Sequence, residues 1–219
     1  MEQVNNNYQA PETDAEITPA PVPGTDKKKK IITIAAAAAL AVIIAIVAII
    51  IINYNSPKSV AERWVDSVWG DGTNRNYYKL SAWDEKEMLL RYWDSEEDFF
   101  EAESKEFDAD ITSFSQYYKA LDEWWKEQLE DTYGDYTIEI EAKNVRDTST
   151  SKTLSSSEIN FIGDIDEIEE EDVAACKKVT VKAKIKGEDN KNEEKYVVYL
   201  AKINGAWKVL GYNTVDDDD

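Results

Sequence analysis

An uninterrupted apolar run at residues 31–52 constrains this chain more than any other feature. It reads IITIAAAAALAVIIAIVAIIII, with Thr33 as its only polar side chain and no charge. A helix of this length covers roughly 33 Å, about the thickness of the hydrocarbon core of a bilayer. Lipid offers no hydrogen-bond partners to the backbone, so an isolated apolar run of this length must be helical there. The sequence therefore predicts a transmembrane helix with its ends at Ile31 and Ile52.

Two other interpretations of this run fit it less well. Core helices of soluble proteins rarely extend past about 14 residues without a polar face. A cleaved signal peptide has an apolar region of roughly 7–15 residues that leads into a small-residue cleavage site. Here the alanines lie at the start, the far end is four isoleucines at 49–52, and no Cys lies near that end to suggest a lipoprotein. We therefore expect an uncleaved signal anchor.

The basic residues around the run predict its orientation. Four lysines stand directly before it, and the next basic residue is Lys58. Positively charged flanks stay on the cytoplasmic side, and they also lie against anionic lipid headgroups. Residues 1–30 are therefore expected to form a cytoplasmic tail, disordered because it is rich in Pro and poor in large apolar side chains. The topology-determining residues are Lys27, Lys28, Lys29 and Lys30.

Composition limits what the outer part can bind. The formal net charge is −20; residues 1–52 contain four lysines and five acidic residues, which leaves −19 for the remainder. Nucleic-acid binding needs basic contacts, so we expect no nucleic-acid partner. The chain has no His and a single Cys, Cys176, so no disulfide can form within it. Disulfide-poor exported domains favour a Gram-positive bacterium as the source.

The first half of the outer part has helical periodicity. Ser56 as N-cap, Pro57 at the first helical position and Gly70 as terminator predict a helix at 57–69. Short helices are expected at 74–80 and 84–93. Ser95 and Asp98 resemble a capping box that starts a helix within the acidic segment 94–110. A long amphipathic helix is expected at 111–131.

The second half alternates with the period of a strand. Strands are predicted at 136–142, 179–185, 196–203 and 207–210, with a hairpin turn at Asn204-Gly205. Residues 148–157 are expected to be a loop, 155–162 a short helix and 165–173 an acidic connector. The fold class is therefore α+β. We expect a linker at 53–56, one extracytoplasmic domain at 57–215 and a solvated acidic tail at 216–219.

The opening helix SPKSVAERWV, at 56–65, and the segment YVVYLAKINGAWKV, at 196–209, carry a resemblance. Their order resembles the cystatin-like, nuclear-transport-factor-2-like superfamily, and in particular the membrane-anchored exported domains of Gram-positive bacteria. The resemblance implies a cone in which N-terminal helices pack on a curved antiparallel sheet. That superfamily includes hydratases, isomerases and polyketide cyclases as well as binding modules without catalytic activity.

No residue pattern in the chain predicts a catalytic, cofactor or metal site. The absence of His excludes the usual hydrolytic triads. Cys176 lies at the entrance to a strand, and we expect it to be a packing residue. The acidic clusters at 164–166 and 169–172 lack the Gly and the ligand spacing of a calcium loop, so we expect them to be solvated.

Dense aromatic side chains suggest where a ligand binds. A concave sheet lined by aromatic rings can bind an apolar ligand, a peptide or a glycan by stacking, although rings at helical spacing also fill cores. The candidate pocket residues are Trp64, Trp83, Tyr136 and Tyr199.

We therefore expect a single-pass cell-membrane protein with a non-catalytic binding or scaffold domain at the cell envelope. Its expected partners are membrane lipid and either an envelope protein or a small ligand; the oligomeric state stays open. One alternative is an enzyme of hydratase or isomerase type that uses a buried carboxylate beside a tyrosine. Another is a sensor that signals through the helix to the short tail.

Overall fold

The computed structural model describes residues 25–70, 72–188 and 190–215, with side chains described from residue 40 onward. The chain divides into two compact units, Met1–Ala48 and Ile49–Asp219. Helix α1, Thr25–Tyr54, includes the whole of the predicted span and begins inside the range that we predicted as tail. Residues 1–24 of that tail and the acidic end at 216–219 lie outside the described residues.

Only part of the predicted span is described in full, because the side chains of residues 31–39 lie outside the described set. Within that set, no single helix has both the length and the apolar composition to cross a bilayer. The helical segments Leu40–Tyr54 and Pro57–Trp69, which are joined at a bend, together have that length and apolar composition.

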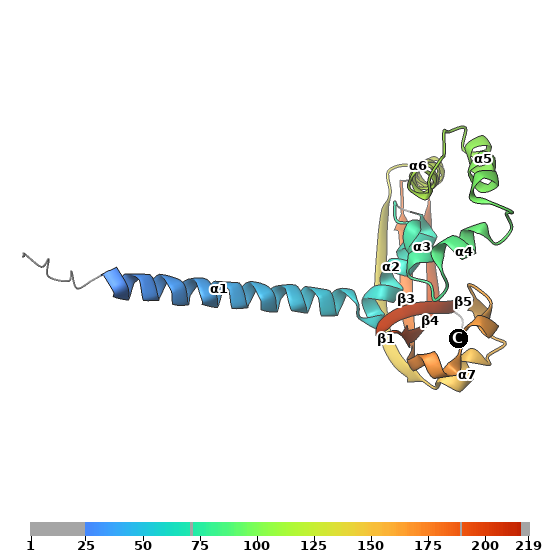
Figure 1. Ribbon diagram of the computed structural model, residues 1–219. Helices are drawn as coiled ribbons and strands as arrows, with labels where there is room; N and C mark the ends of the chain where they lie inside the picture. The colour runs from blue at the N-terminus through green and yellow to red at the C-terminus, as the bar shows by residue number, and fades with distance from the viewer. Residues whose placement is uncertain (1–24, 71, 189, 216–219) are drawn as a thin grey trace, which may run out of the picture. The chain divides into compact units, whose positions relative to one another are not determined.

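The second unit is built on one antiparallel sheet of five strands in the order β1-β3-β4-β5-β2 (Figure 1). Consecutive hairpins join β3, β4 and β5, and β1 pairs with β3. The predicted α+β class with an antiparallel meander is therefore confirmed. The strands are β1 Thr137–Thr148, β2 Asn160–Phe161, β3 Val173–Lys186, β4 Lys191–Ile203 and β5 Ala206–Thr214.

The turn between β4 and β5 has the geometry that its sequence predicts. Asn204 has φ 50° and Gly205 has φ 81°. Two successive positive φ values match the right-handed twist of the flanking strands, and Asn-Gly adopts them at low cost. The turn thereby sets the register that places Ala206 opposite Ile203.

Helix α2, Pro57–Trp69, packs on the sheet and contacts all four long strands. Its ends follow the sequence signals: the Ser56 side chain accepts a hydrogen bond from the Ser59 N–H, and Gly70 ends the helix with φ 76°. Trp64 and Val65 on its inner face are completely buried. Burial of each such side chain contributes about 1.5–3 kcal/mol, so packing on the sheet stabilises this short helix.

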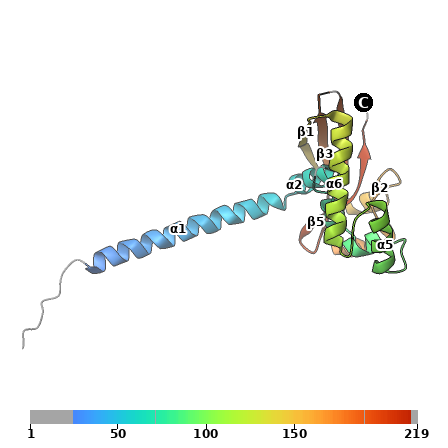
Figure 2. The same ribbon diagram turned by 90° about the horizontal axis from the view of Figure 1, so that it is seen from above.

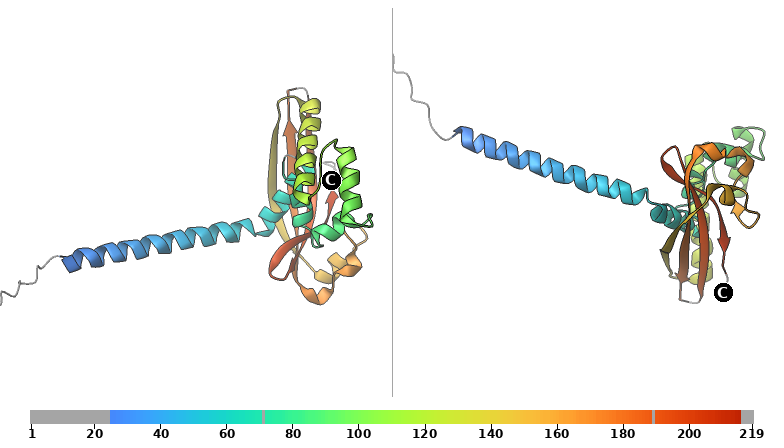
Figure 3. Two further views of the ribbon diagram at one scale, coloured as in Figure 1. Left: turned by 45° about the horizontal axis from the view of Figure 1, so that its top comes forward. Right: turned by 90° about the horizontal axis from the view of Figure 1, so that it is seen from below.

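Four more helices precede the sheet, as predicted: α3 Arg75–Lys79, α4 Glu85–Leu90, α5 Glu96–Glu106 and α6 Phe114–Tyr133. Helices α5 and α6 lie side by side (Figures 2 and 3). Aromatic rings fill the space between them, with Phe99 5.0 Å from Tyr117 between centroids. Helix α6 begins three residues later than the periodicity suggests, because Ser113 caps it.

The prediction of a short helix at 155–162 is wrong. The structure has helix α7 at Thr150–Leu154, inside the range that we predicted as loop, followed by β2 paired with β5. Ser149 caps α7 by accepting from the Lys152 N–H. Strand β2 can approach because β5 carries Gly211 there: a Cβ on Gly211 would lie 2.4 Å from the Asn160 carbonyl oxygen.

The acidic connector folds into two single 3-10 turns, η1 Ile165–Glu167 and η2 Glu170–Asp172. Apolar side chains of this segment pack with Val173, Cys176, Ala201 and Leu210 in a second core cluster. The Cys176 side chain is buried, and burial raises the pKa of its thiol. The packing role predicted for this cysteine is confirmed.

Candidate functional site

The four candidate pocket aromatics do not gather around one cavity. Trp64 is completely buried. Its ring lies 5.5 Å from that of Tyr77 and 5.2 Å from that of Tyr212. It therefore fills the space between α2 and the sheet, where a ligand inside a cone would lie.

Tyr136 and Tyr199 lie elsewhere. Tyr136 is half-buried and lines a shallow depression with Lys126 and Glu130 at the end of α6. Tyr199 is half-buried in β4, and partial burial raises the pKa of its phenol, with a smaller contribution from Glu158. Of the four predicted residues, Trp83 is the one that lines the pocket described next.

Trp83 occupies the loop between α3 and α4 and packs against the segment that follows β2. Its indole is 8% exposed, and its Nε1–H donates to the Asp164 carbonyl oxygen at 2.9 Å. The backbone of Gly163 touches the ring so closely that an added Cβ would lie 2.4 Å from it. Residue 163 therefore has to be glycine for the indole to occupy this position.

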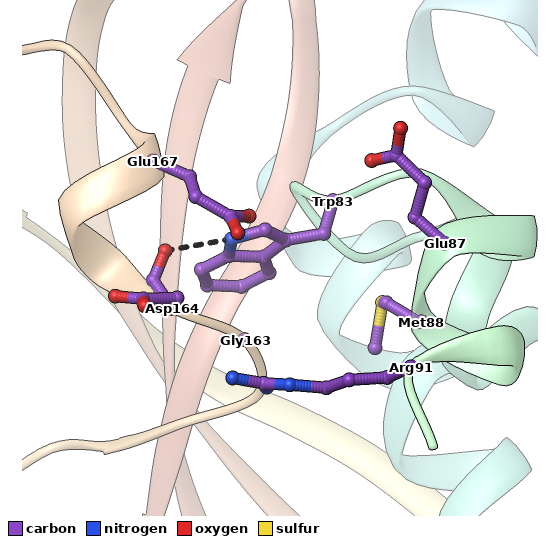
Figure 4. Close-up of a pocket in the computed structure, with 7 residues that line it drawn as sticks. All are labelled: Trp83, Glu87, Met88, Arg91, Gly163, Asp164 and Glu167. Carbon is purple, nitrogen blue, oxygen red and sulfur yellow. Dashed lines mark hydrogen bonds between the residues drawn. The ribbon is translucent and has the colours of Figure 1, made fainter. Parts of the chain in front are cut away.

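A pocket of about 80 Å³ opens beside this indole (Figure 4). Helix α4 supplies Glu87 and Met88 on one side, and Arg91 follows the end of that helix. The turn around η1 supplies Asp164 and Glu167 on the other side. The lining residues are Trp83, Glu87, Met88, Arg91, Gly163, Asp164 and Glu167.

The composition of this pocket favours a cation. Three of its seven residues are carboxylates and one is a basic residue. Indole faces attract cations, and methionine adapts to the shape of an apolar stem. The volume matches the end of one side chain and is far below the 300–1,000 Å³ usual for metabolites and cofactors. Its size and its excess of acidic residues suit the charged end of one basic side chain.

A second polar arrangement connects the main core to the surface. The Trp69 Nε1–H donates to the Tyr196 hydroxyl at 3.2 Å, and that hydroxyl donates to the Glu194 carboxylate. Burial, reinforced by the adjacent Glu194, raises the pKa of Tyr196. Glu194 is half-buried, and no Asp or Glu side chain among the described residues is buried. The buried carboxylate that the enzyme alternative requires is not among them.

Two adjacent charged side chains of α2 connect this helix to its neighbours. The Arg63 guanidinium lies 3.7 Å from the centroid of the Tyr54 ring, and its Nη2 donates to the Tyr54 carbonyl oxygen at 2.9 Å. Glu62, the residue directly before Arg63, accepts from the Ala142 N–H through Oε1 at 2.9 Å, where β1 has a register shift. These contacts connect the last turn of α1 to α2, and α2 to the first strand.

In the described part of the chain, no three His, Cys, Asp or Glu side chains form a group that could hold a metal ion. No protein-family model, no curated protein and no solved structure matches this chain.

The partners of Trp83 were not recognised in the sequence. Asp164 belonged to the acidic cluster at 164–166 that we expected to be solvated, and Glu167 belonged to the acidic connector at 165–173. We assigned no role to Gly163 from the sequence. A glycine just after a short apolar run was the one local feature that could have indicated a close approach.

Proposed function

We propose that this chain is a single-pass membrane protein whose outer domain binds a protein partner at the cell envelope. The N-terminal tail is cytoplasmic and the α+β domain is extracytoplasmic. Binding occurs without catalysis.

One observation carries the membrane proposal. From Leu40 to Ile52 the described part of α1 exposes its large apolar side chains on every face, with exposed fractions between 47% at Val47 and 68% at Ile52. Exposure of such a surface to water costs about 25 cal/mol of free energy per Å², whereas its contact with lipid avoids this cost. The four lysines before residue 31 support the orientation.

The binding part of the proposal rests on the Trp83 pocket. A buried indole fixed by its own hydrogen bond provides a rigid floor, and acidic residues line the pocket from two segments far apart in the sequence. Rigid pockets that take one long side chain are typical anchors of protein–protein interfaces. The partner is accordingly expected to present a basic side chain.

The cystatin-like architecture is also part of the proposal. One helix packed across an antiparallel meander, as α2 is on β1, β3, β4 and β5, supports it. A cone of this kind serves here as a scaffold, because Trp64 fills its inner side.

Alkaline carbonate extraction of the full chain tests the membrane proposal. The wild-type chain is expected to remain in the membrane pellet. Ile43→Arg combined with Ile46→Arg should move it to the supernatant, since each central Arg costs about 2.5–3.5 kcal/mol of insertion free energy. The matched control is Tyr92→Arg, at a side chain that is 87% exposed in the outer domain. Extraction of the wild-type chain would refute the proposal.

A further inference from the structure

A hollow of about 460 Å³ lies beside the junction of α1 and α2. All of its lining residues belong to the unit Ile49–Asp219. The end of α1 contributes Ile50, Asn53 and Tyr54; the segment around the start of α2 contributes Ser56, Lys58, Ser59 and Glu62. The lining therefore combines an apolar side chain, an aromatic ring, neutral polar groups, one cation and one anion.

The hollow has a defined shape because hydrogen bonds and a ring contact fix the residues around it. Arg63 stacks on Tyr54 and donates to its carbonyl oxygen, which fixes the last turn of α1. The Glu62 carboxylate accepts a hydrogen bond from the Ala142 N–H, which fixes its position. A pre-formed site of this kind loses little conformational entropy when a ligand enters.

Lys58 is available to a ligand. Its Nζ lies 3.9 Å from Glu62 Oε1, and its side chain is 53% exposed. An exposed pair at that distance contributes little, so the ammonium group can turn to another anion. The Glu62 carboxylate, 29% exposed, remains beside it as the only acidic group of the lining.

We propose that this hollow binds the headgroup of a phospholipid in the outer leaflet. The proposal rests on the membrane anchoring proposed above. With the span ending at Ile52, Ile50 lies at the edge of the hydrocarbon, and Tyr54 lies at the headgroup level that tyrosines favour. The opening of the hollow is thereby in contact with lipid.

Each part of the lipid has a partner among the residues that line the hollow. Lys58 pairs with the phosphate, and the Asn53 amide and Ser59 hydroxyl donate to its remaining oxygens. Ile50 contacts the first methylenes of the acyl chain. Glu62 pairs with an amine and repels a second anion, so the hollow selects phosphatidylethanolamine over phosphatidylglycerol.

Native mass spectrometry of the full chain, released from nanodiscs of equimolar phosphatidylethanolamine and phosphatidylglycerol, tests this site. The wild-type chain is expected to retain phosphatidylethanolamine. Lys58→Gln should lower its retention about tenfold, the effect of losing one charge-assisted hydrogen bond. The matched control is Lys126→Gln, because Lys126 has the same i,i+4 arrangement with Glu130, at 3.6 Å, and is 63% exposed.

The remaining outcomes are distinct. Glu62→Gln keeps the acceptor for Ala142 and should remove the preference between the two lipids. Equal retention by wild-type and Lys58→Gln chains, or complete displacement of the lipid by millimolar inorganic phosphate, would overturn the headgroup site while leaving the anchor intact. Failure of the wild-type chain to enter nanodiscs would instead refute the membrane proposal, and the headgroup site with it.

Discussion

The Arg63 guanidinium stacks on the Tyr54 ring at 3.7 Å and donates to the carbonyl oxygen of the same residue at 2.9 Å. One side chain of α2 thus binds both the ring and the backbone at the last residue of α1. The last carbonyl groups of a helix lack partners within it, and a cation there also complements the helix dipole. This contact therefore forms a connection between the last residue of α1 and α2, both within the unit Ile49–Asp219.

Replacing Arg63 should loosen that connection without unfolding the domain. Arg63→Ala removes a stacking contact worth about 0.5–1 kcal/mol and a charged hydrogen bond. We expect faster amide hydrogen exchange at residues 51–56 and little change in the melting temperature of the outer domain. Arg63→Lys should give an intermediate rate because it keeps the charge but loses the planar stacking group. An unchanged exchange rate in Arg63→Ala would show that the contact does not restrain the end of α1.

Glu62 should matter for stability through its acceptor oxygen. Ala142 is buried, and its N–H has Glu62 Oε1 as partner. Glu62→Ala leaves that donor unsatisfied, so we expect the free energy of unfolding in urea to fall by about 1–3 kcal/mol. Glu62→Gln retains an acceptor and should lose less than half of that. Glu130→Ala serves as control, since Glu130 also has an i,i+4 lysine but is 56% exposed. Equal losses in Glu62→Ala and Glu130→Ala would contradict this role.

Alkaline pH should destabilise the domain through Tyr77, a half-buried tyrosine. Burial raises the pKa of Tyr77 from 10.0 to about 12, with smaller contributions from Tyr212 and Tyr78. The contribution is fully present below pH 10, because the unfolded chain is then also protonated. It falls between about pH 10 and 12, by about 1.4 kcal/mol per pH unit for one group, as the unfolded chain releases the proton that the folded chain keeps.

Tyr77→Phe should therefore reduce the slope of unfolding free energy against pH in this window, measured by urea titration at several pH values. Tyr92→Phe, at a ring that is 87% exposed, is the control and should keep the wild-type pH dependence. An unchanged slope in Tyr77→Phe would contradict the assignment.

The Trp83 pocket should bind a guanidinium group. In a two-dimensional NMR spectrum with ¹⁵N-labelled indoles, N-acetyl-arginine amide is expected to shift the Trp83 signal at millimolar concentration. Glu87→Gln combined with Glu167→Gln should weaken this binding about tenfold through lost charge pairing. Glu169→Gln combined with Glu171→Gln makes the same change of net charge outside the pocket lining. Similar weakening in both double variants would show a general charge effect and no specific site.

Much of the fold could be predicted because its signals are local. Ser56, Pro57 and Gly70 define the ends of α2, and Asn204-Gly205 defines a hairpin, through backbone preferences of the residues themselves. The segment 155–162 was predicted wrongly because its structure depends on a distant contact. Strand β2 exists because Gly211, about fifty residues further along the chain, lets it approach β5.

The candidate site was predicted less well for the same reason. Trp83 was selected as an aromatic residue, but its role depends on Gly163 and Asp164, about eighty residues away. Trp64 was selected by the same criterion and proved to be core. Residue type alone does not distinguish the two, because burial on all sides is decided by which segments the sheet topology brings together.

Cysteine labelling in intact cells tests the central proposal most directly. The single native cysteine, Cys176, is buried, so it gives a low background. A membrane-impermeant maleimide is expected to label Glu123→Cys, whose position in α6 is exposed, before permeabilisation. Asn7→Cys in the tail should be labelled only afterwards. Labelling of Asn7→Cys in intact cells, or protection of Glu123→Cys until permeabilisation, would contradict a membrane-anchored domain on the outer face.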